Sequence, residues 1–299
     1  MPPDVAVVIV THNSRTVVGG LLDSLPAALD GCSGDVVVVD NGSADGTAAY
    51  LAARGDCRVV TAANDGYAAG INRGVRAAAA APAILVLNPD VRLHPKAVPP
   101  LLAALAEPGV GIVAPQVRSP HGGLELSLRR KPTLARALGL TRTRLAVFSE
   151  YVHGASWYAR PCTVDWALGA VLLMSRACYD LLGGWDESFF LYSEETDLAL
   201  RARDLGLRTR YEPRSIAVHI GGGSGRSAAT HAMQIVNRVR LYRRRHGPVT
   251  SWCYYWLAVA SELSRVPRGH RESWFAARTL LRPSLRPAEL RCSRRIMPQ

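Results

Sequence analysis

Three unbroken runs of β-branched and aliphatic residues mark the first ninety residues of the chain. Runs without polar alternation predict strands that are buried on both faces of a sheet. The stretches between them carry apolar residues at helical spacing. The predicted strands are Val5–Val10, Val36–Val39 and Ile84–Leu87, and the predicted helices are Thr16–Leu25, Ser43–Arg54 with Ser43 as N-cap, and Gly70–Ala81, which ends at Pro82.

This alternation of strands and helices predicts an α/β fold. Its central sheet should be Rossmann-like and mostly parallel, with helices on both faces and ligands at the carboxyl ends of the strands. Polar residues follow each predicted strand and form the candidate site: Thr11 to Asn13, Asp40 to Gly42 and Asn88 to Asp90.

The pattern is less regular in the second part of the chain. We expect a helix and connector over Pro95–Pro120, and an acceptor-facing or mobile segment over 129–156, which lacks a clear period. Ordered elements then return, with a strand over Val164–Met174, a helix over Leu198–Leu207 and a strand over Thr209–Pro213. The composition changes after the glycine-rich run at 221–225, which is either a linker or a phosphate-binding loop. We therefore predict domains at 1–225 and 226–299.

Charge separates the two predicted domains. The chain has a net charge of +12, and residues 226–299 alone contain fifteen Arg and three acidic residues, so residues 1–225 are neutral. Apolar residues of this tail share one helical face, namely Trp252, Tyr255, Trp256, Val259 and Leu263, and Arg residues flank them. Two interpretations are open: an interfacial helix docked on the cytoplasmic membrane surface, or a helical hairpin that packs on the catalytic domain.

The same composition limits location and partners. The pI of about 9.9 raises a nucleic-acid role, but the charge is segregated and no recognition motif is present, so we expect no nucleic acid. Trp252–Ala260 is too short to cross a bilayer. Six cysteines form no Cys-x-x-Cys pair and no secretory signal precedes the first strand, so we predict a reduced cytoplasmic protein, peripheral on the membrane if the tail docks there.

The strongest chemical signal is a group of three carboxylates, Glu194, Glu195 and Asp197. Acids this close repel one another, so they are typical of sites where a metal, a proton or a cation stabilises them. A solvated helix start, where acids favour the helix dipole, is the alternative. Asp40 suits either a nucleoside contact or a turn, and Asp90 either a hard cation such as Mg²⁺ or Mn²⁺ or a turn. A Rossmann oxidoreductase is strongly disfavoured because Thr11–Ser14 stands where its glycine-rich turn belongs.

These segments together resemble glycosyltransferase family 2, the inverting enzymes of GT-A fold, in the rhamnosyltransferase-like branch. The resemblance covers about Val5 to Ser224. It rests on five ordered signatures, which lie at Val10–Ser14, Val39–Ser43, Asn64–Asn72, Leu87–Asp90 and Gly183–Leu198.

The resemblance implies roles for individual residues. The nucleotide-sugar would contact Thr11, Asn13, Asp40, Asn64, Gly66, Gly70, Asn72 and Asn88. A divalent metal, Mg²⁺ or Mn²⁺, would rest on Asp90 and His219 with the donor diphosphate, because Asn88 stands where the first acid of the family's Asp-x-Asp motif belongs. Trp166, Gly169 and Ala170 match an element near the acceptor, although a buried strand carrying Trp is an equal alternative.

The resemblance also implies the catalytic group. Glu195 occupies the position of the family's catalytic base, where Asp is usual, with Glu194 and Asp197 as neighbours that orient it or raise its pKa. It would deprotonate an acceptor hydroxyl, which attacks the anomeric carbon of a nucleotide-diphospho-sugar with inversion. The first choice of donor is dTDP-rhamnose, with uridine-diphospho-sugars as alternatives. The expected acceptor is a glycan, a polyprenyl-diphosphate-linked intermediate or a small molecule, and the rival function is a catalytically inactive nucleotide or sugar binder.

Overall fold

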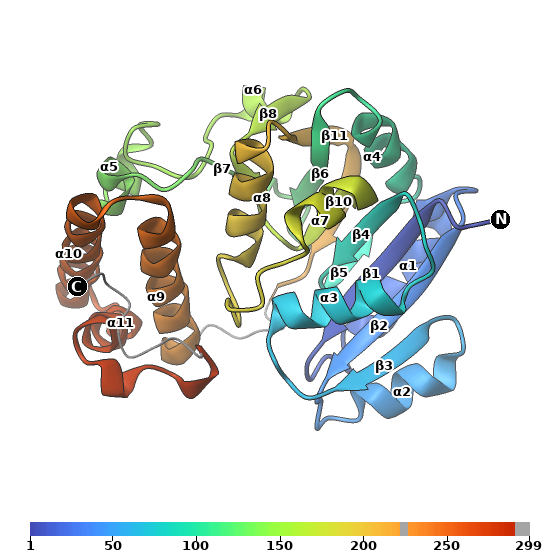
Figure 1. The fold of residues 1–299 in the computed structure, drawn as a ribbon, viewed down its shortest axis with the longest axis horizontal. Helices are drawn as coiled ribbons and strands as arrows, with labels where there is room; N and C mark the ends of the chain where they lie inside the picture. Colours follow the sequence, from blue (N-terminus) through green and yellow to red (C-terminus); the bar gives the residue numbers. More distant parts are fainter. Residues whose placement is uncertain (222–226, 291–299) are drawn as a thin grey trace.

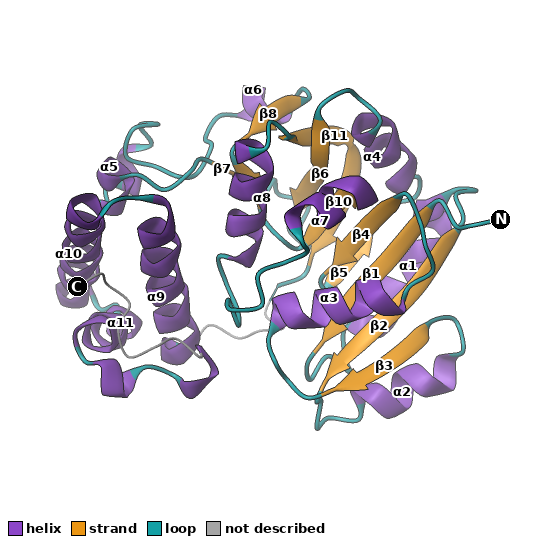
Figure 2. Cartoon of the chain, in the orientation of Figure 1, coloured by secondary structure: helices purple, strands orange, loops and turns teal. Residues whose placement is uncertain are grey.

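The fold is organised around one large mixed sheet (Figures 1 and 2). A computed structural model of the chain describes residues 1–221 and 227–290. Its strands are β1 (Val5–Thr11), β2 (Gly34–Asn41), β3 (Arg58–Ala62), β4 (Ala83–Leu87), β5 (Val91–Leu93), β6 (Val110–Arg118), β7 (Leu128–Arg129), β8 (Cys162–Val164), β9 (Trp166–Ala167), β10 (Val171–Ser175) and β11 (Arg208–His219).

Helices cover the sheet and form a separate group at the C-terminal end. They are α1 (Val18–Leu29), α2 (Thr47–Arg54), α3 (Tyr67–Ala77), α4 (Val98–Leu105), α5 (Leu134–Ala137), α6 (Ala155–Tyr158), α7 (Arg176–Leu182), α8 (Glu194–Asp204), α9 (Ala228–Arg245), α10 (Pro248–Arg265) and α11 (Arg271–Leu281). Figure 1 shows α9, α10 and α11 together on one side of the molecule, close to α5.

The strand order of the nine-stranded sheet is β3-β2-β1-β4-β10-β6-β11-β5, with β8 also pairing with β11. The strands β3, β2, β1 and β4 pair in parallel, as predicted from their unbroken apolar runs. Beyond them β10 inserts antiparallel between β4 and β6, so the parallel prediction holds for the first half of the sheet and the second half is mixed.

Alternate residues of the central strands fill two cores on opposite faces of the sheet. Val7 and Ile9 of β1 pack with apolar residues of α1 and α4. Val8 and Val10 point to the other face, where α3, α7 and α8 lie. Both faces are therefore covered, which explains why these strands carry no polar residues. A third apolar cluster joins α9, α10 and α11.

Several sequence expectations about elements were wrong in detail. Pro95–Pro120 contains the helix α4 but also the strand β6. This strand was not predicted because it contains Gly111 and Pro115, which are unusual in strands. Val164–Met174 is divided between β8, β9 and β10. Ser43 does not cap a helix: α2 begins at Thr47 with Gly46 as N-cap, and the Ser43 side chain bonds to Asp40 instead.

Candidate active site

The carboxyl ends of β1 and β2 form a closely bonded polar cluster. The Thr11 hydroxyl donates to Asp40 Oδ1 (3.0 Å), and the Ser43 hydroxyl and backbone N–H donate to the same carboxylate. Asn13 adopts a left-handed backbone (φ 52°) and accepts a hydrogen bond from Ala44 N–H. Thr11 and Asp40 are buried, whereas Asn13 is exposed. The parallel register brings these three residues, which were predicted to contact the nucleotide-sugar, to one edge of the sheet.

The glycines of the Asn64–Asn72 segment approach protein atoms closely. A Cβ at Gly66 (φ +102°) would lie 2.6 Å from the carbonyl oxygen of Phe190, and one at Gly70 would lie 2.7 Å from Val10. Asn64 is exposed and its side-chain oxygen accepts from Gly66 N–H. The two glycines therefore allow this segment to pack against β1 and against the loop that precedes α8.

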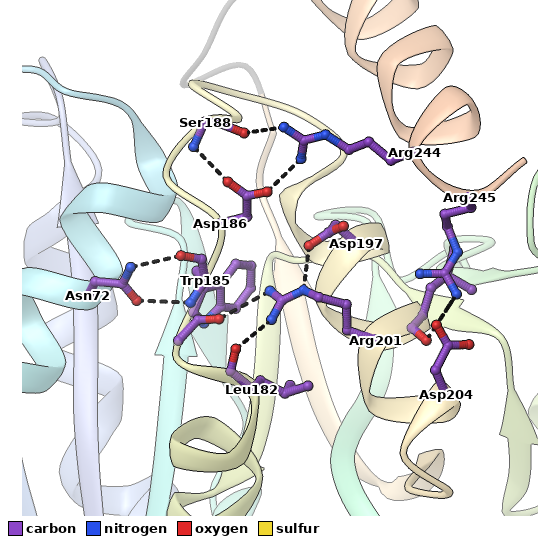
Figure 3. A network of polar contacts seen from close by, with 12 residues as sticks. Asn72, Leu182, Trp185, Asp186, Ser188, Asp197, Arg201, Asp204, Arg244 and Arg245 are labelled. Atoms are coloured by element: carbon purple, nitrogen blue, oxygen red, sulfur yellow. Dashed lines mark hydrogen bonds and ion pairs between the residues drawn. The ribbon is translucent and has the colours of Figure 1, made fainter.

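Asn72 bonds to a distant segment of the chain (Figure 3). Its amide donates to the Trp185 carbonyl and to Glu187, and its oxygen accepts from Trp185 N–H and the Tyr179 hydroxyl, at 2.9–3.0 Å. The side chain is buried and its hydrogen-bonding capacity is filled by protein groups. We therefore assign Asn72 a structural role in place of the expected donor contact.

Asn88 follows β4 and bonds to two other segments of the candidate site. Its side-chain oxygen accepts a hydrogen bond from the Tyr67 hydroxyl (2.7 Å), and its backbone N–H donates to the Ala170 carbonyl (2.9 Å). Burial raises the pKa of Tyr67, and the charges of Glu194, Glu195 and Asp90 raise it further. Tyr67 thus links the end of β4 with the acidic helix start, and the sequence reasoning missed it although it lies inside the Asn64–Asn72 signature.

Asp90 and His219 lie side by side, as the metal prediction requires. His219 Nε2 is 3.5 Å from Asp90 Oδ1, and His219 Nδ1 is 3.5 Å from Glu125. The hydrogen bond to Asp90 raises the pKa of His219. In residues 1–221 and 227–290, no three His, Cys, Asp or Glu side chains are arranged to hold a metal ion. The pair fits a divalent cation that takes its other ligands from substrate and water.

Glu194 and Glu195 begin α8, where Glu194 is buried and Glu195 is half-buried. One oxygen of each carboxylate, Oε2, is buried and has no hydrogen-bond partner among the described residues. Burial raises the pKa of both side chains; the nearby charge of Glu195 raises that of Glu194 further, and backbone N–H groups and Arg129 partly offset the shift of Glu195. A carboxyl group with a raised pKa is suited to accept a proton near neutral pH.

The backbone that leads into this helix is unusual. Tyr192 and Ser193 both have positive φ angles, 69° and 75°, although neither is glycine. Such strain persists where surrounding contacts impose it, and it is found at functional sites. The contacts here come from α9, because the buried Asn237 donates to the carbonyl groups of Leu191 and Tyr192.

Two of the three predicted acceptor residues, Trp166 and Gly169, lie near Glu195, whereas Ala170 is buried in the core. A Cβ at Gly169 would lie 3.3 Å from Glu195 Cβ, so the absence of a side chain there leaves room for the glutamate. Trp166 donates to the Arg130 carbonyl and, with Glu195, lines a cavity of about 300 Å³. The cavity lies between the sheet domain and the C-terminal helices, since α8, the 129–150 segment, α9 and α10 all contribute to its wall.

Asp197 does not share this environment. Arg201 Nε donates to it (2.6 Å), and the same guanidinium bonds to the carbonyl groups of Leu182 and Gly184 (Figure 3). Burial raises the pKa of Asp197, and Arg201 opposes the shift. Asp197 was expected to orient Glu195. It instead holds Arg201, which bonds to the turn before the acidic stretch.

Arginines of the tail anchor it to the rest of the chain. Arg244 pairs with Asp186, and Arg245 pairs with Asp204 (Figure 3). Arg238 pairs with Glu150, and Arg240 donates to the Ser188 carbonyl. Several arginines that were expected to flank a membrane-facing surface therefore bond to other parts of the chain. These contacts favour the packing interpretation for the arginine side of α9.

α10 has two different faces. Tyr255 and Val259 are buried, whereas Trp252 and Trp256 are 40% and 55% exposed and Leu263 is 38% exposed. The predicted apolar face is thus divided between packing and solvent. Over the described residues, no helix has the length and the apolar character that crossing a bilayer would require.

Residues 6–160, more than half of the chain, match the sequence model of a family described as Glycosyl transferase family 2. The chain belongs to glycosyltransferase family 2. A relative from Mycobacterium tuberculosis, the N-acetylglucosaminyl-diphospho-decaprenol L-rhamnosyltransferase, is 32% identical over 224 residues, which cover 66% of this chain and 70% of the relative. The chain is a glycosyltransferase, as the resemblance implied.

Solved glycosyltransferases share its fold. GalNAc-T7, solved with UDP, GalNAc and Mn²⁺, has a TM-score of 0.59 at 15% identity; the match covers 93% of this chain and 54% of the longer GalNAc-T7 chain. The mannosyltransferase PcManGT from Pyrobaculum calidifontis, solved with GDP-Man and Mn²⁺, has a TM-score of 0.54 at 16% identity, covering 93% of this chain and 79% of that one. The predicted GT-A fold is confirmed.

Proposed function

We propose that this family 2 enzyme is an inverting transferase that moves a sugar from a nucleotide-diphospho-sugar to an acceptor hydroxyl. One observation carries the proposal: Glu195 lines a cavity and its pKa is raised, and its charge acts on Tyr67, whose hydroxyl bonds to Asn88 at the end of β4. The first choice of donor is dTDP-rhamnose, because the Mycobacterium tuberculosis relative bears a rhamnosyltransferase name.

The proposed reaction is a single displacement. Glu195 takes the proton of the acceptor hydroxyl, the acceptor oxygen bonds to the anomeric carbon, and the bond from that carbon to the nucleotide diphosphate breaks. Because attack and departure occur on opposite sides, the anomeric configuration inverts. Burial, and after it the charge of Glu195, raise the pKa of Glu194, which favours a neutral neighbour for the base.

The site has two groups suited to a divalent cation. Asp90 and His219 would hold Mg²⁺ or Mn²⁺ together with the donor diphosphate. A bound cation neutralises charge on the departing diphosphate. Thr11, Asn13 and Asp40 would meet the nucleoside at the ends of β1 and β2, where ligands bind in sheets of this kind.

Transfer to a lipid-linked acceptor would explain the outer face of α10. Trp252, Trp256 and Leu263 are exposed there, while Ser261 and Arg265 of the same helix line the cavity. Interfacial helices combine an exposed aromatic face with nearby arginines. We infer that this face meets the cytoplasmic membrane surface while the acceptor head group enters the cavity.

A nucleotide-release assay tests the transferase function. The full chain is incubated with Mn²⁺ and dTDP-rhamnose or a UDP-sugar, and free nucleotide diphosphate is measured. Release that is abolished in Glu195→Ala and Asp90→Ala supports an enzyme with these roles. No release by the wild type with any donor, together with retained donor binding, would favour the inactive binder.

Liposome co-sedimentation tests the membrane contact. We compare the wild type with the double variant Trp252→Ser/Trp256→Ser on vesicles rich in anionic phosphatidylglycerol. The matched control is Leu181→Ser/Leu205→Ser, which changes two exposed apolar residues, 62% and 52% accessible, elsewhere on the surface. Binding lost only in the tryptophan variant supports the contact, and equal sedimentation of all three proteins rejects it.

A further inference from the structure

The cavity beside Glu195 holds more positive charge than its own carboxylates neutralise. Arg238 pairs with Glu150, and Arg265 pairs with Glu262, which also bonds to His231. Arg129 and Arg136 line the same cavity, and neither takes part in an ion pair within residues 1–221 and 227–290. The remaining carboxylate, Glu195, is the proposed base.

Arg129 is held in place without a carboxylate. Its Nη1 donates to the carbonyl groups of Leu126 and Leu128. Its guanidinium carbon lies 3.9 Å from the ring centre of Tyr151 and 5.7 Å from that of Trp166. Burial lowers the pKa of Arg129. A half-buried cation in this state is stabilised by an anion that approaches from the cavity.

Arg136 offers a second cation from the neighbouring helix α5. It donates to the carbonyl groups of Ala146 and Lys131, which fix its direction but carry no net charge. Burial lowers its pKa too, and the charge of Arg130 adds to the effect. Both guanidinium groups are therefore preorganised by backbone oxygens. The charges of Glu150, Glu195 and Asp165 offset only part of the effect of burial on their pKa values.

We propose that Arg129 and Arg136 form an anion subsite for the diphosphate of a diphosphate-linked acceptor, whose sugar hydroxyl then reaches Glu195. This inference rests on the proposed transferase function. A cavity of about 300 Å³ is at the lower limit of small-molecule pockets. It accommodates the head group of such an acceptor and leaves an attached chain outside, on the side of α10.

Metal-free binding separates this subsite from the donor site. We titrate the full chain, in EDTA, with geranyl diphosphate and with geraniol, and record heat by calorimetry. The variants are Arg129→Gln and Arg136→Gln, with Arg129→Lys to retain the charge. Arg160→Gln is the matched control, because Arg160 is exposed and lines neither this cavity nor its neighbour.

We expect the wild type to bind geranyl diphosphate and not geraniol. Each Gln variant should weaken this binding about tenfold, as expected for the loss of a charge-assisted hydrogen bond, while Arg129→Lys keeps part of it and Arg160→Gln matches the wild type. Equal binding by the wild type and both Gln variants, or equal loss in Arg160→Gln, would overturn the proposal. Inorganic pyrophosphate is the probe without a hydrocarbon chain, and its binding to the wild type would assign the affinity to the diphosphate itself. Binding of geraniol without binding of geranyl diphosphate would contradict the subsite.

Donor binding is measured in parallel by the thermal shift that nucleotide-sugar and Mn²⁺ produce. A shift retained in Arg129→Gln and Arg136→Gln confirms that these variants are folded and that their defect lies in the acceptor subsite. If the wild type shows no donor shift but binds geranyl diphosphate, the transferase proposal fails while the anion subsite stands.

Discussion

Gly169 provides a direct test of how the proposed base is positioned. In Gly169→Ala, the new Cβ would lie 3.3 Å from Cβ and 3.4 Å from Cγ of Glu195. Carbon atoms in ordinary contact are about 3.5–4.0 Å apart, so the Cβ of Glu195 must move by roughly 0.2–0.7 Å from its distance of 3.3 Å. Since a misplacement of about 1 Å can reduce a rate about 10²-fold, we expect kcat to fall roughly 3- to 25-fold.

The assay is steady-state release of nucleotide diphosphate at saturating donor, with the donor KM measured separately. The donor KM should stay near that of the wild type, because Gly169 contacts Glu195 and not the strand ends of β1 and β2. Gly247→Ala is the matched control, since nothing lies within 4 Å of a Cβ there and its φ is −65°. A wild-type kcat in Gly169→Ala would refute the positioning argument, as would an equal loss in Gly247→Ala.

Three further predictions concern the same region. The acid limb of kcat/KM against pH should lie above the ordinary carboxyl range, because burial raises the pKa of Glu195 and the base must be ionised; a limb near the ordinary value of about 4.5 would contradict this. Glu194→Gln should raise the melting temperature at about pH 8 and not at about pH 4.5, because a carboxyl group whose pKa is raised in the fold loses stability as pH rises from its unfolded towards its folded pKa. An equal gain at both values would exclude that cause. Asn72→Ala should lower the free energy of unfolding by roughly 2–4 kcal/mol in urea titrations, because two buried backbone groups of Trp185 lose their partner; a changed donor KM without a stability loss would restore the donor contact.

The parts of the fold that local patterns specify were predictable. The runs Val5–Val10 and Ile84–Leu87 became β1 and β4 because strands buried on both faces require continuous apolar residues. The polar residues that follow these strands lie at one edge of the sheet, as predicted, because parallel strands end together. Asp90 and His219, 129 positions apart, were paired only through the family resemblance, and the structure places them 3.5 Å apart.

Long-range side-chain contacts were not predictable, because they leave no local signal. Asn72 accepts a hydrogen bond from the backbone N–H of Trp185, 113 positions away. The residues next to Asn72 in the sequence do not distinguish this structural contact from a ligand contact. Arg129 lies in a segment without periodicity, so its place between Tyr151 and Trp166 could not be read from the sequence. The arginines of α9 looked like a surface patch because their partners, such as Asp186 and Asp204, lie more than twenty residues earlier in the chain, in other segments.

The shared wall of the cavity has a consequence for engineering. A chimera that moved only residues 226–299 of this chain onto another protein would separate the arginines of α9 from Glu150, Asp186 and Asp204, the acids with which they pair. It would also separate Asn237 from the left-handed turn before Glu195. Grafts meant to move the proposed acceptor cavity as a unit should therefore cross over ahead of β7, and should leave in place the ends of β1 and β2 that we propose meet the nucleotide.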